Sequence, residues 1–283
     1  MVDVFLPSDL REALRIRASR GAVPFGGGTD LMVRLRRGAG AVPEFGSPVM
    51  FLDRIPELRV LRLDPGALEI GAMTKLADIA ASPLVHPVLR DAVLCIGGPA
   101  LRNAATLGGN LCNASPAADT LPFLYAFGAS VRIVSASAER IVPVEEFITG
   151  PGKTSLGPSE IVVGVIVPAW EPDIRFWRKV GTRKANALTK VSIAAFAEVS
   201  GGRISAARIA LGAVAPTVIR LRGAEKCLEG VALVELPGKA AEVRAECVMA
   251  VRPIDDQRST AEYRARVAAN LTEEFLRIAS GGR

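Results

Sequence analysis

Two stretches of small and polar residues carry the groups in this sequence that could bind a charged ligand. The first is residues 24–31, P-F-G-G-G-T-D-L, and the second is residues 102–119, R-N-A-A-T-L-G-G-N-L-C-N-A-S-P-A-A-D. Glycines let a backbone approach a ligand closely, and exposed N–H groups, hydroxyls and amides can then bind phosphate oxygens. A Gly-Gly pair alone is more often a turn between sheet elements. Two such loops in one chain favour a single ligand with two phosphates, held from both sides.

The elements around the first loop are expected to present its backbone to an anion. Residues 9–20 have apolar positions at helical spacing, with Ser8 as the expected N-cap, and residues 22–25 predict a short strand. A second helix is expected over residues 31–37. The loop therefore places N–H groups at a helix N-terminus, where the helix dipole favours an anion. Asp30 is expected to cap this helix or brace the loop.

Neither stretch matches the common nucleotide-binding fingerprints. Leu31 stands where G-x-G-x-x-G would place its third glycine, and no Gly-Lys-Ser/Thr follows the first loop. The second stretch has too few large apolar side chains for a core helix, and we expect a loop there. The loops therefore indicate phosphate binding of a different type.

The rest of the chain predicts an α+β fold in two domains. Residues 1–171 form the first domain, with sub-parts of about 1–54 and 55–171, and residues 172–283 form the second. Strands are expected at 49–53, 60–63, 68–70, 131–134, 141–144, 161–167, 176–180, 194–199 and 204–211. Helices are expected at 74–81, 87–96, 122–127, 221–228, 236–250 and 258–279.

Composition indicates a globular protein. Of the 283 residues, 49% are hydrophobic, and the mean hydropathy of +0.30 is sufficient for a large core. No uninterrupted apolar run approaches the roughly 20 residues that a membrane span needs, and no signal segment precedes the first helix. We therefore expect a cytoplasmic protein without a membrane span.

Charge and metal-ligand content exclude other function classes. The formal net charge is +6, but the basic residues are dispersed and only 5% of residues are aromatic, which disfavours nucleic-acid binding. The four cysteines are scattered, without iron–sulfur or zinc spacing, and are expected to be reduced and mostly buried. The single histidine, His86, is expected to pack in a loop. No metal site and no catalytic side chain are predicted.

Four segments together resemble the FAD-binding medium subunit of molybdenum hydroxylases, the xanthine dehydrogenase and carbon monoxide dehydrogenase family. Residues 26–32 are similar to the family's A-G-G-T-D-L-L, and residues 102–119 to its R-N-x-A-T-I-G-G-N and A-S-P-x-x-D. Residues 179–191 resemble its K-x-x-x-R stretch, and residues 253–264 its P-x-D-D-x-R-x-x-x-x-Y-R. The likeness covers nearly the whole chain in order.

The resemblance implies a fold and a cofactor. The fold would be a two-part FAD-binding domain of the vanillyl-alcohol oxidase-like (PCMH) type, followed by a small α+β domain of the CO dehydrogenase flavoprotein type. Lys179 would approach the pyrimidine edge of the flavin, where a positive charge stabilises reduced flavin. The alternative for Lys179 is a surface salt bridge. The implied FAD-binding residues are Phe25, Gly26, Gly27, Gly28, Thr29, Asp30, Leu31, Ile96, Gly97, Thr106, Gly108, Gly109, Asn110, Asn113, Ser115, Asp119, Val162 and Lys179.

The roles within that set follow the same resemblance. The 27–31 loop and residues 106–110 would hold the pyrophosphate. Asn113, Ser115 and Asp119 would reach the ribityl and adenosine side, and residues 96–97 would lie beside the isoalloxazine ring.

The resemblance also implies partners. A separate molybdopterin-binding large subunit and a separate 2Fe–2S small subunit would accompany this oxidoreductase chain in a dimer of heterotrimers. FAD would pass electrons to NAD, a quinone, oxygen or another acceptor. The alternatives are a stand-alone FAD-dependent reductase or oxidase of the same fold and a non-enzymatic nucleotide-binding module.

Some positions depart from the family pattern. Gly26 replaces an alanine and Leu107 an isoleucine, and both changes are mild. Ala185, Asn186 and Ala187 stand where the family often has acidic residues, so a function of those acids, such as contact with the electron acceptor, is not expected here.

Overall fold

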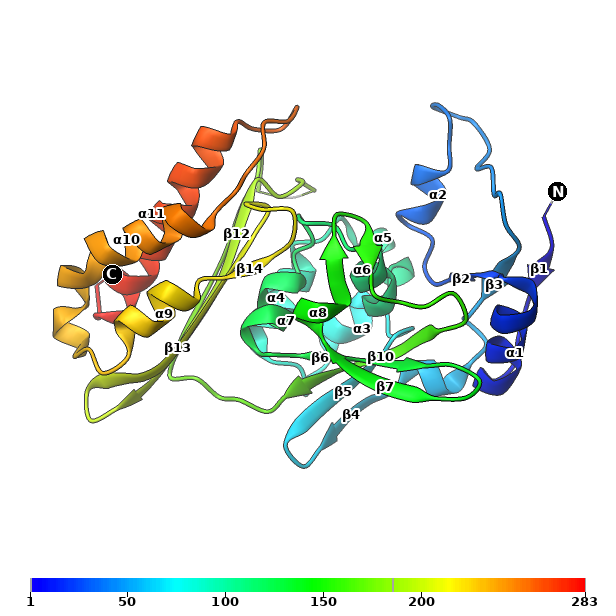
Figure 1. Ribbon diagram of the computed structural model, residues 1–283, viewed down its shortest axis with the longest axis horizontal. Helices are drawn as coiled ribbons and strands as arrows, with labels where there is room; N and C mark the ends of the chain where they lie inside the picture. Colours follow the sequence, from blue (N-terminus) through cyan, green and yellow to red (C-terminus); the bar gives the residue numbers. More distant parts are fainter. Residues whose placement is uncertain (1, 185, 283) are drawn as a thin grey trace. The chain divides into compact units, whose positions relative to one another are not determined.

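The computed structural model describes residues 2–184 and 186–282 and divides into two compact units (Figure 1). Unit 1 contains the residues up to Val85, Gly98–Ala114 and Ala129–Ala169, and unit 2 contains His86–Gly97, Ser115–Gly128 and the residues from Trp170 onward. Two short segments from the first half of the chain thus belong to unit 2. The α+β class expected from the sequence is confirmed. The domain boundaries expected after residues 54 and 171 stay predictions.

A three-stranded parallel sheet, in the order β1-β3-β2, carries the first glycine loop of unit 1. Its elements are β1 (Val4–Phe5), α1 (Leu10–Arg20), β2 (Val23–Phe25), α2 (Leu31–Arg34) and β3 (Val49–Phe51). The carboxylate of Asp9 accepts a hydrogen bond of 2.8 Å from the amide of Glu12. Asp9, rather than the expected Ser8, is therefore the N-cap of α1.

The second sheet of unit 1 has five antiparallel strands in the order β4-β5-β10-β6-β7. The hairpin predicted around Asp64-Pro65-Gly66 joins its first two strands. The strands are β4 (Leu61–Asp64), β5 (Ala67–Gly71), β6 (Ser130–Val134), β7 (Glu139–Pro143) and β10 (Ile161–Pro168). The predicted strand at 161–167 is thus the central one, which explains its nearly continuous apolar sequence.

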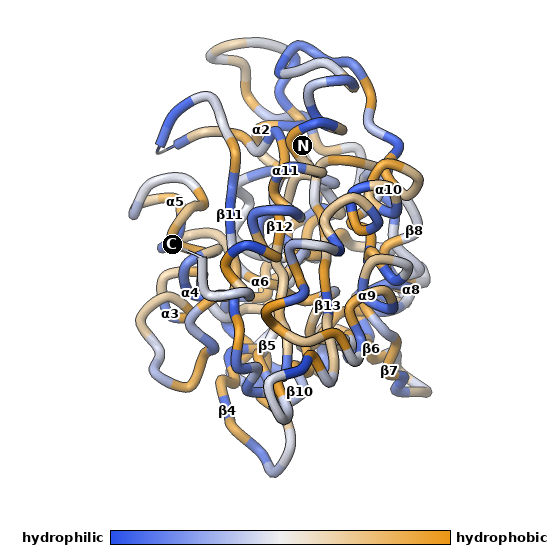
Figure 2. The backbone as a smooth tube through the Cα atoms, turned by 90° about the vertical axis from the view of Figure 1, so that its left-hand side faces the viewer, coloured by the Kyte–Doolittle hydropathy of each residue, from blue (hydrophilic) through white to orange (hydrophobic). Residues whose placement is uncertain are grey.

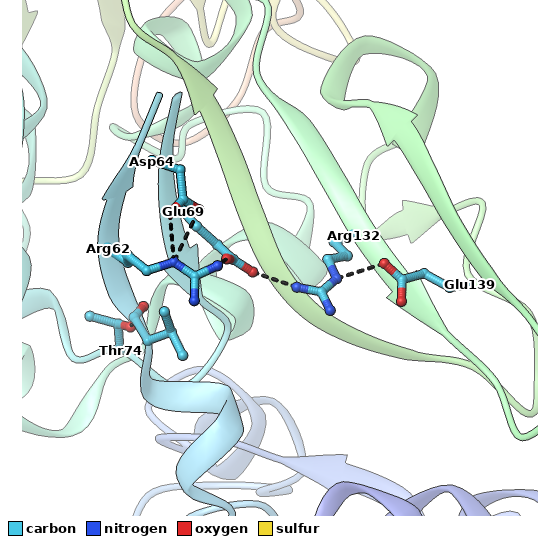
Figure 3. A network of polar contacts seen from close by, with 7 residues as sticks. Arg62, Asp64, Glu69, Thr74, Arg132 and Glu139 are labelled. Atoms are coloured by element: carbon cyan, nitrogen blue, oxygen red, sulfur yellow. Dashed lines mark hydrogen bonds and ion pairs between the residues drawn. The ribbon is translucent and has the colours of Figure 1, made fainter. Parts of the chain in front are cut away.

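A ladder of alternating charges crosses this five-stranded sheet (Figure 3). Arg62 forms ion pairs with Asp64 and Glu69, and Glu69 forms a second pair with Arg132 at 2.5 Å. The intervening strand β10 has Gly164 opposite Arg132, so no side chain stands there between the partners. Because the arginines are about one-third exposed or more, the ladder contributes little to stability.

Short helices and one small hairpin complete unit 1. They are η1 (Pro56–Arg59), α3 (Leu76–Ala81), α5 (Pro99–Ala104), α6 (Leu107–Asn113), α8 (Val144–Phe147), β8 (Ile148–Gly150) and β9 (Lys153–Thr154). Two of these helices lie in or beside the second small-residue stretch. The expectation of a loop throughout residues 102–119 was therefore wrong, because a helix there needs only a short buried face, which Leu107 and Leu111 supply.

Unit 2 is built on a four-stranded antiparallel sheet in the order β11-β12-β13-β14. The predicted turn at Gly201-Gly202 joins its two central strands, and both glycines have positive φ. The strands are β11 (Ile174–Val180), β12 (Val191–Ser200), β13 (Arg203–Gly212) and β14 (Ile219–Arg220). The helices are α4 (Pro87–Leu94), α7 (Leu121–Ala126), α9 (Arg222–Leu228), η2 (Leu233–Lys239), α10 (Ala240–Ala250) and α11 (Ala261–Ala279). The α-helix predicted at 236–250 begins only at Ala240, because the residues before it, which include Pro237, belong to the 3-10 helix η2.

Both faces of the unit 2 sheet are buried. Ile193 and Ala195 of β12 belong to a core that also contains residues of α9, α10 and α11. On the opposite face Phe196 lies 5.0 Å from Phe127, between ring centroids, and 5.8 Å from His86. His86 therefore packs among aromatic rings, as expected from the sequence, and its Nδ1 accepts a hydrogen bond from the amide of Val88.

Along the chain, hydrophobic stretches alternate at short intervals with hydrophilic ones (Figure 2). Among the residues that the structure describes, no helix has the length and apolar character that crossing a membrane requires. The same residues contain no group of three or more His, Cys, Asp or Glu arranged to hold a metal ion. The four cysteines carry free thiols. Cys247 is buried and the other three are partly exposed, so the expectation that most of the cysteines are buried was wrong.

Candidate cofactor site

The first glycine loop follows β2 directly and turns into the single helical turn of α2. Gly28 has a φ of +70°, and a side chain there would also collide with the ring of Phe25. Asp30 occupies the N-cap position of α2, but its side chain makes no capping hydrogen bond. Because α2 is much shorter than expected, the helix dipole contributes less here than the loop amides themselves.

The two glycine motifs meet in unit 1, although 70 residues separate them. A Cβ on Gly27 would overlap the carbonyl oxygen of Ala104, and a Cβ on Gly26 would lie 2.9 Å from Oγ1 of Thr106. The same carbonyl of Ala104 accepts a hydrogen bond from Nζ of Lys75 at 3.1 Å. The loops therefore contact each other through backbone atoms, and only glycine fits at the point of closest approach.

The two loops differ in whether their backbone amides are already hydrogen-bonded within the protein. Within the described part of the chain, the amides of Gly27, Gly28 and Thr29 make no hydrogen bond to protein. In the second motif the amide of Gly108 donates to Ala72 at 2.9 Å, and that of Gly109 donates to Oγ1 of Thr106 at 3.1 Å. The first loop therefore supplies the unpaired donors that an anion requires.

In the second motif, glycine allows α6 to pack closely against the end of β5. Thr106 caps α6, and a Cβ on Gly108 would lie 2.7 Å from both Cβ and the carbonyl oxygen of Ala72. The helix can therefore lie directly against the end of β5. The remaining predicted positions of this segment are the half-buried Asn110 and Asn113 on α6, and Val162 is buried in β10.

Unit 2 contains a buried ion pair between two of the predicted site residues. Nζ of Lys179, on β11, lies 2.6 Å from Oδ2 of Asp119 and also donates to the carbonyl of Cys95 at 2.9 Å. The hydroxyl of Thr189 donates to the other oxygen of Asp119 at 2.5 Å. The Lys179 side chain is only 12% exposed. Lys179 therefore forms the salt bridge of the alternative interpretation, but in a largely buried place rather than on the surface, and its role toward the flavin stays a prediction.

Burial raises the pKa of Asp119, while the charge of Lys179 and the hydrogen bonds from Lys179 and Thr189 oppose that change. The pair presents little net charge, because cation and anion are in contact. Lys179 uses two of its three N–H groups within the protein, which leaves one for a ligand.

The other predicted residues of unit 2 lie on connecting segments. Ile96 and Gly97 follow the carbonyl of Cys95 that binds Lys179, and Gly97 has a φ of +51°. The hydroxyl of Ser115 accepts a hydrogen bond from the amide of Ala117 at 3.3 Å. Of the positions that depart from the family's acidic residues, Ala185 lies outside the described residues.

Sequence reasoning did not single out Thr189. It falls inside the quoted segment 179–191, but nothing in its neighbours distinguishes it from any strand-edge threonine. The sequence points to Thr189 as a site residue only through its position in the segment that begins with Lys179.

Two family models cover the chain. Residues 1–170 match the FAD binding domain in molybdopterin dehydrogenase, and residues 177–279 match the CO dehydrogenase flavoprotein C-terminal domain. This chain belongs to the molybdopterin dehydrogenase flavoprotein family. It therefore binds FAD and is the flavin-carrying component of an oxidoreductase.

Relatives across the family agree with this assignment. The chain is 30% identical to the carbon monoxide dehydrogenase medium chain of Hydrogenophaga pseudoflava, over 96% of this chain and 95% of that protein. It is also 30% identical to the putative xanthine dehydrogenase FAD-binding subunit of Escherichia coli, over 91% and 89% of the two chains. The molybdenum hydroxylase flavoprotein expected from the motifs is therefore confirmed at the level of the family.

Two solved structures also match nearly the whole length of this chain. Carbon monoxide dehydrogenase from Hydrogenophaga pseudoflava gives a TM-score of 0.88 at 28% identity, covering 96% of this chain and 95% of that chain. Quinoline 2-oxidoreductase from Pseudomonas putida gives a TM-score of 0.89 at 26% identity, covering 99% and 97%. The described residues fit FAD, because the unpaired amides of the first loop suit a pyrophosphate and the loop admits no side chain at Gly27.

Proposed function

We propose that this chain is the electron-transfer subunit of a heteromeric molybdenum hydroxylase. A separate molybdopterin-binding large subunit would oxidise the substrate, and a separate 2Fe–2S small subunit would relay the electrons. Bound FAD supplies the redox chemistry that passes them to an external acceptor. The relatives named as medium chains and FAD-binding subunits support this arrangement. The assembly into a dimer of heterotrimers and a cytoplasmic location are parts of the same proposal.

The observation that carries the proposal is the meeting of the two glycine motifs. The amides of Gly27, Gly28 and Thr29 make no hydrogen bond to the described residues, and the backbone contact beside them excludes side chains. We assign the pyrophosphate to this loop, together with Thr106 and the side chain of Asn110. A diphosphate accepts several hydrogen bonds at once, which a run of unpaired amides can donate without a lysine.

The Asp119–Lys179 pair is the second part of the proposed site. We assign it to the ribityl and flavin end of FAD, with Ile96 and Gly97 beside the ring. One N–H of Lys179 remains for a flavin oxygen or nitrogen, and the contact with Asp119 moderates the positive charge that the flavin experiences. The chain thereby sets the cofactor's position and electrostatics, and none of its side chains is assigned a proton-transfer role toward the substrate.

Two measurements test the proposal. The full chain is saturated with FAD, freed of excess, and its visible spectrum is recorded; we expect one flavin per chain. A tagged chain is then purified from its own host under native conditions, and we expect molybdenum, iron and two further subunits in constant ratio. A chain that retains no flavin contradicts the site, and a lone chain with full dehydrogenase activity supports the stand-alone reductase instead.

A further inference from the structure

The guanidinium of Arg264 makes four hydrogen bonds in the interior of unit 2. Arg264 lies in the first turn of α11 and is only 4% exposed. Its Nη2 donates to both carboxylate oxygens of Asp256, at 2.9 and 2.8 Å. Its Nη1 donates to the carbonyls of Lys190 and Ala213, at 2.8 and 3.0 Å. The planar fork of arginine suits this combination, and the single ammonium of lysine does not.

The carbonyl of Lys190 belongs to a segment that supports both members of the Asp119–Lys179 pair. Thr189, the preceding residue, donates its hydroxyl to Asp119. The amide of Lys190 itself donates at 2.8 Å to the carbonyl of Val180, which follows Lys179. Arg264 therefore holds the carbonyl of Lys190, the residue whose amide contacts the Lys179 strand and whose neighbour Thr189 contacts Asp119.

The carbonyl of Ala213 belongs to the segment that supports Asp119 from the other side. Ala213 has a φ of +62°, which is unusual for a residue with a Cβ. Its amide donates at 2.8 Å to the carbonyl of Pro116, three residues before Asp119. The strained backbone of Ala213 thus points its amide at the Asp119 loop and its carbonyl at Arg264.

A purely structural role is the alternative, and unit 2 contains a suitable comparison. Arg220 forms two hydrogen bonds of 2.7 Å with Glu225, and both side chains are less than 10% exposed. The two arginines are similarly buried, whereas Glu225 is more buried than Asp256, whose side chain is 28% exposed. Arg220 also donates to the carbonyl of Tyr125 at 3.3 Å, and these bonds differ from those of Arg264, which go to Asp256, Lys190 and Ala213.

We propose that Arg264, held by Asp256, is a positioning residue for the Asp119–Lys179 pair, and that Thr189 is the link between them. The inference rests on the proposed role of that pair toward FAD. It gives the segment 253–264 a function: by fixing how closely Asp119 contacts Lys179, the segment sets how much positive charge the flavin experiences. Loosening the contact favours reduced flavin and makes its reduction potential more positive.

Redox titration of FAD in the purified holoprotein, followed by visible spectroscopy, tests the inference. Asp119→Asn is the reference variant, with an expected rise of about 30 mV, the equivalent of a tenfold gain in relative affinity for reduced FAD. Thr189→Val and Arg264→Lys are expected to shift the potential in the same direction, by about 15 mV, which is roughly a threefold gain. Arg220→Lys is the matched control and is expected to leave the potential unchanged.

Each outcome distinguishes the two proposals. If Asp119→Asn and Lys179→Met both leave the potential unchanged, the assignment of the pair to the flavin fails, and this inference fails with it. If those variants shift it but Thr189→Val does not, the positioning role is overturned and the flavin assignment stands. Thr189→Val keeps the test decisive even if Arg264→Lys does not fold. An equal shift in Arg220→Lys would overturn the inference, because the effect would then be general destabilisation.

Discussion

Gly27 and Ala104 touch through their backbones, and a Cβ on Gly27 would overlap the carbonyl oxygen of Ala104. The contact joins two motifs that lie far apart in the sequence. It also leaves the amide of Gly27 without a protein partner within the described residues. The contact is possible because glycine carries a second α-hydrogen where any other residue would carry a Cβ.

Gly27→Ala is expected to destabilise the chain and to abolish FAD binding. The added methyl group must displace the backbone at Ala104, and overpacking of this kind costs about 1–3 kcal/mol or more in the free energy of unfolding. Urea denaturation and retention of flavin after gel filtration measure the two effects. Gly46→Ala is the control, because a Cβ there meets open space, and its effect should stay within about 0.5 kcal/mol. Equal behaviour of the two variants would contradict the contact.

Protonation of His86 is expected to lower stability between about pH 6.5 and pH 4. Burial, followed by the charge of Arg175, lowers the pKa of His86 to about 4, while Glu171 opposes the change. In the unfolded chain the pKa returns to about 6.5, so the unfolded state binds more protons in this window and the free energy of unfolding falls as the pH falls.

Thermal unfolding of the protein and of His86→Asn across this pH range checks the prediction. Asparagine keeps an acceptor at the N-cap of α4 but does not titrate. We expect the melting temperature of the variant to depend less on pH above pH 4.5. Parallel curves for the two proteins would show that His86 does not carry the effect.

The thiol of Cys112 is expected to be unreactive in the folded chain. The residue as a whole is partly exposed, but the packing around its sulfur desolvates the thiolate and raises the pKa to about 12, so at pH 8 only about one molecule in 10,000 carries the reactive thiolate. Iodoacetamide labelling followed by mass spectrometry should leave Cys112 unmodified under native conditions and label it fully in urea. Native labelling at the rate of a free thiol would contradict the raised pKa.

Ser192→Ala is expected to be neutral or stabilising. Its Oγ is buried and, among the described residues, has no hydrogen-bond partner, and an unpaired buried hydroxyl costs about 1–3 kcal/mol. A Cβ on Gly212 would lie 2.5 Å from this oxygen. Gly212→Ala should therefore cost less in the Ser192→Ala background than alone. A double-mutant cycle by urea denaturation measures this coupling, and strict additivity would contradict it.

Patterns of neighbouring residues predicted the turns, strands and helices that neighbouring residues determine by themselves. The turn at Asp64-Pro65-Gly66 and the strand at 161–167 need only turn chemistry and apolar runs, and both are confirmed. The long helix expected at 258–279 is confirmed as α11, which begins slightly later because Thr260 is its N-cap. The two glycine-rich motifs predicted that both loops would face one ligand, whereas their direct backbone contact was not predicted.

Long-range contacts explain what the sequence did not predict. The packing of α6 depends on the contact between Gly108 and Ala72. Ala72 lies 36 positions earlier in the chain, so no local pattern reveals this contact. The pairing of Lys179 with Asp119 spans 60 positions, and the link through Thr189 depends on the register of β11 with β12. Residues that act through such contacts carry no recognisable pattern of their own.

The membership of residues 115–128 in unit 2 limits where this protein can be divided. Phe123 and Phe127, with ring centroids 4.1 Å apart, complete the aromatic face of a sheet whose strands come from the C-terminal half. A fragment that starts at Trp170 would expose Phe196 to water. A fragment that ends there would contain Phe123 and Phe127 without the sheet against which they pack. Gene fusions and chimeras between relatives should therefore exchange the chain as a whole, since no single cut yields two self-sufficient pieces.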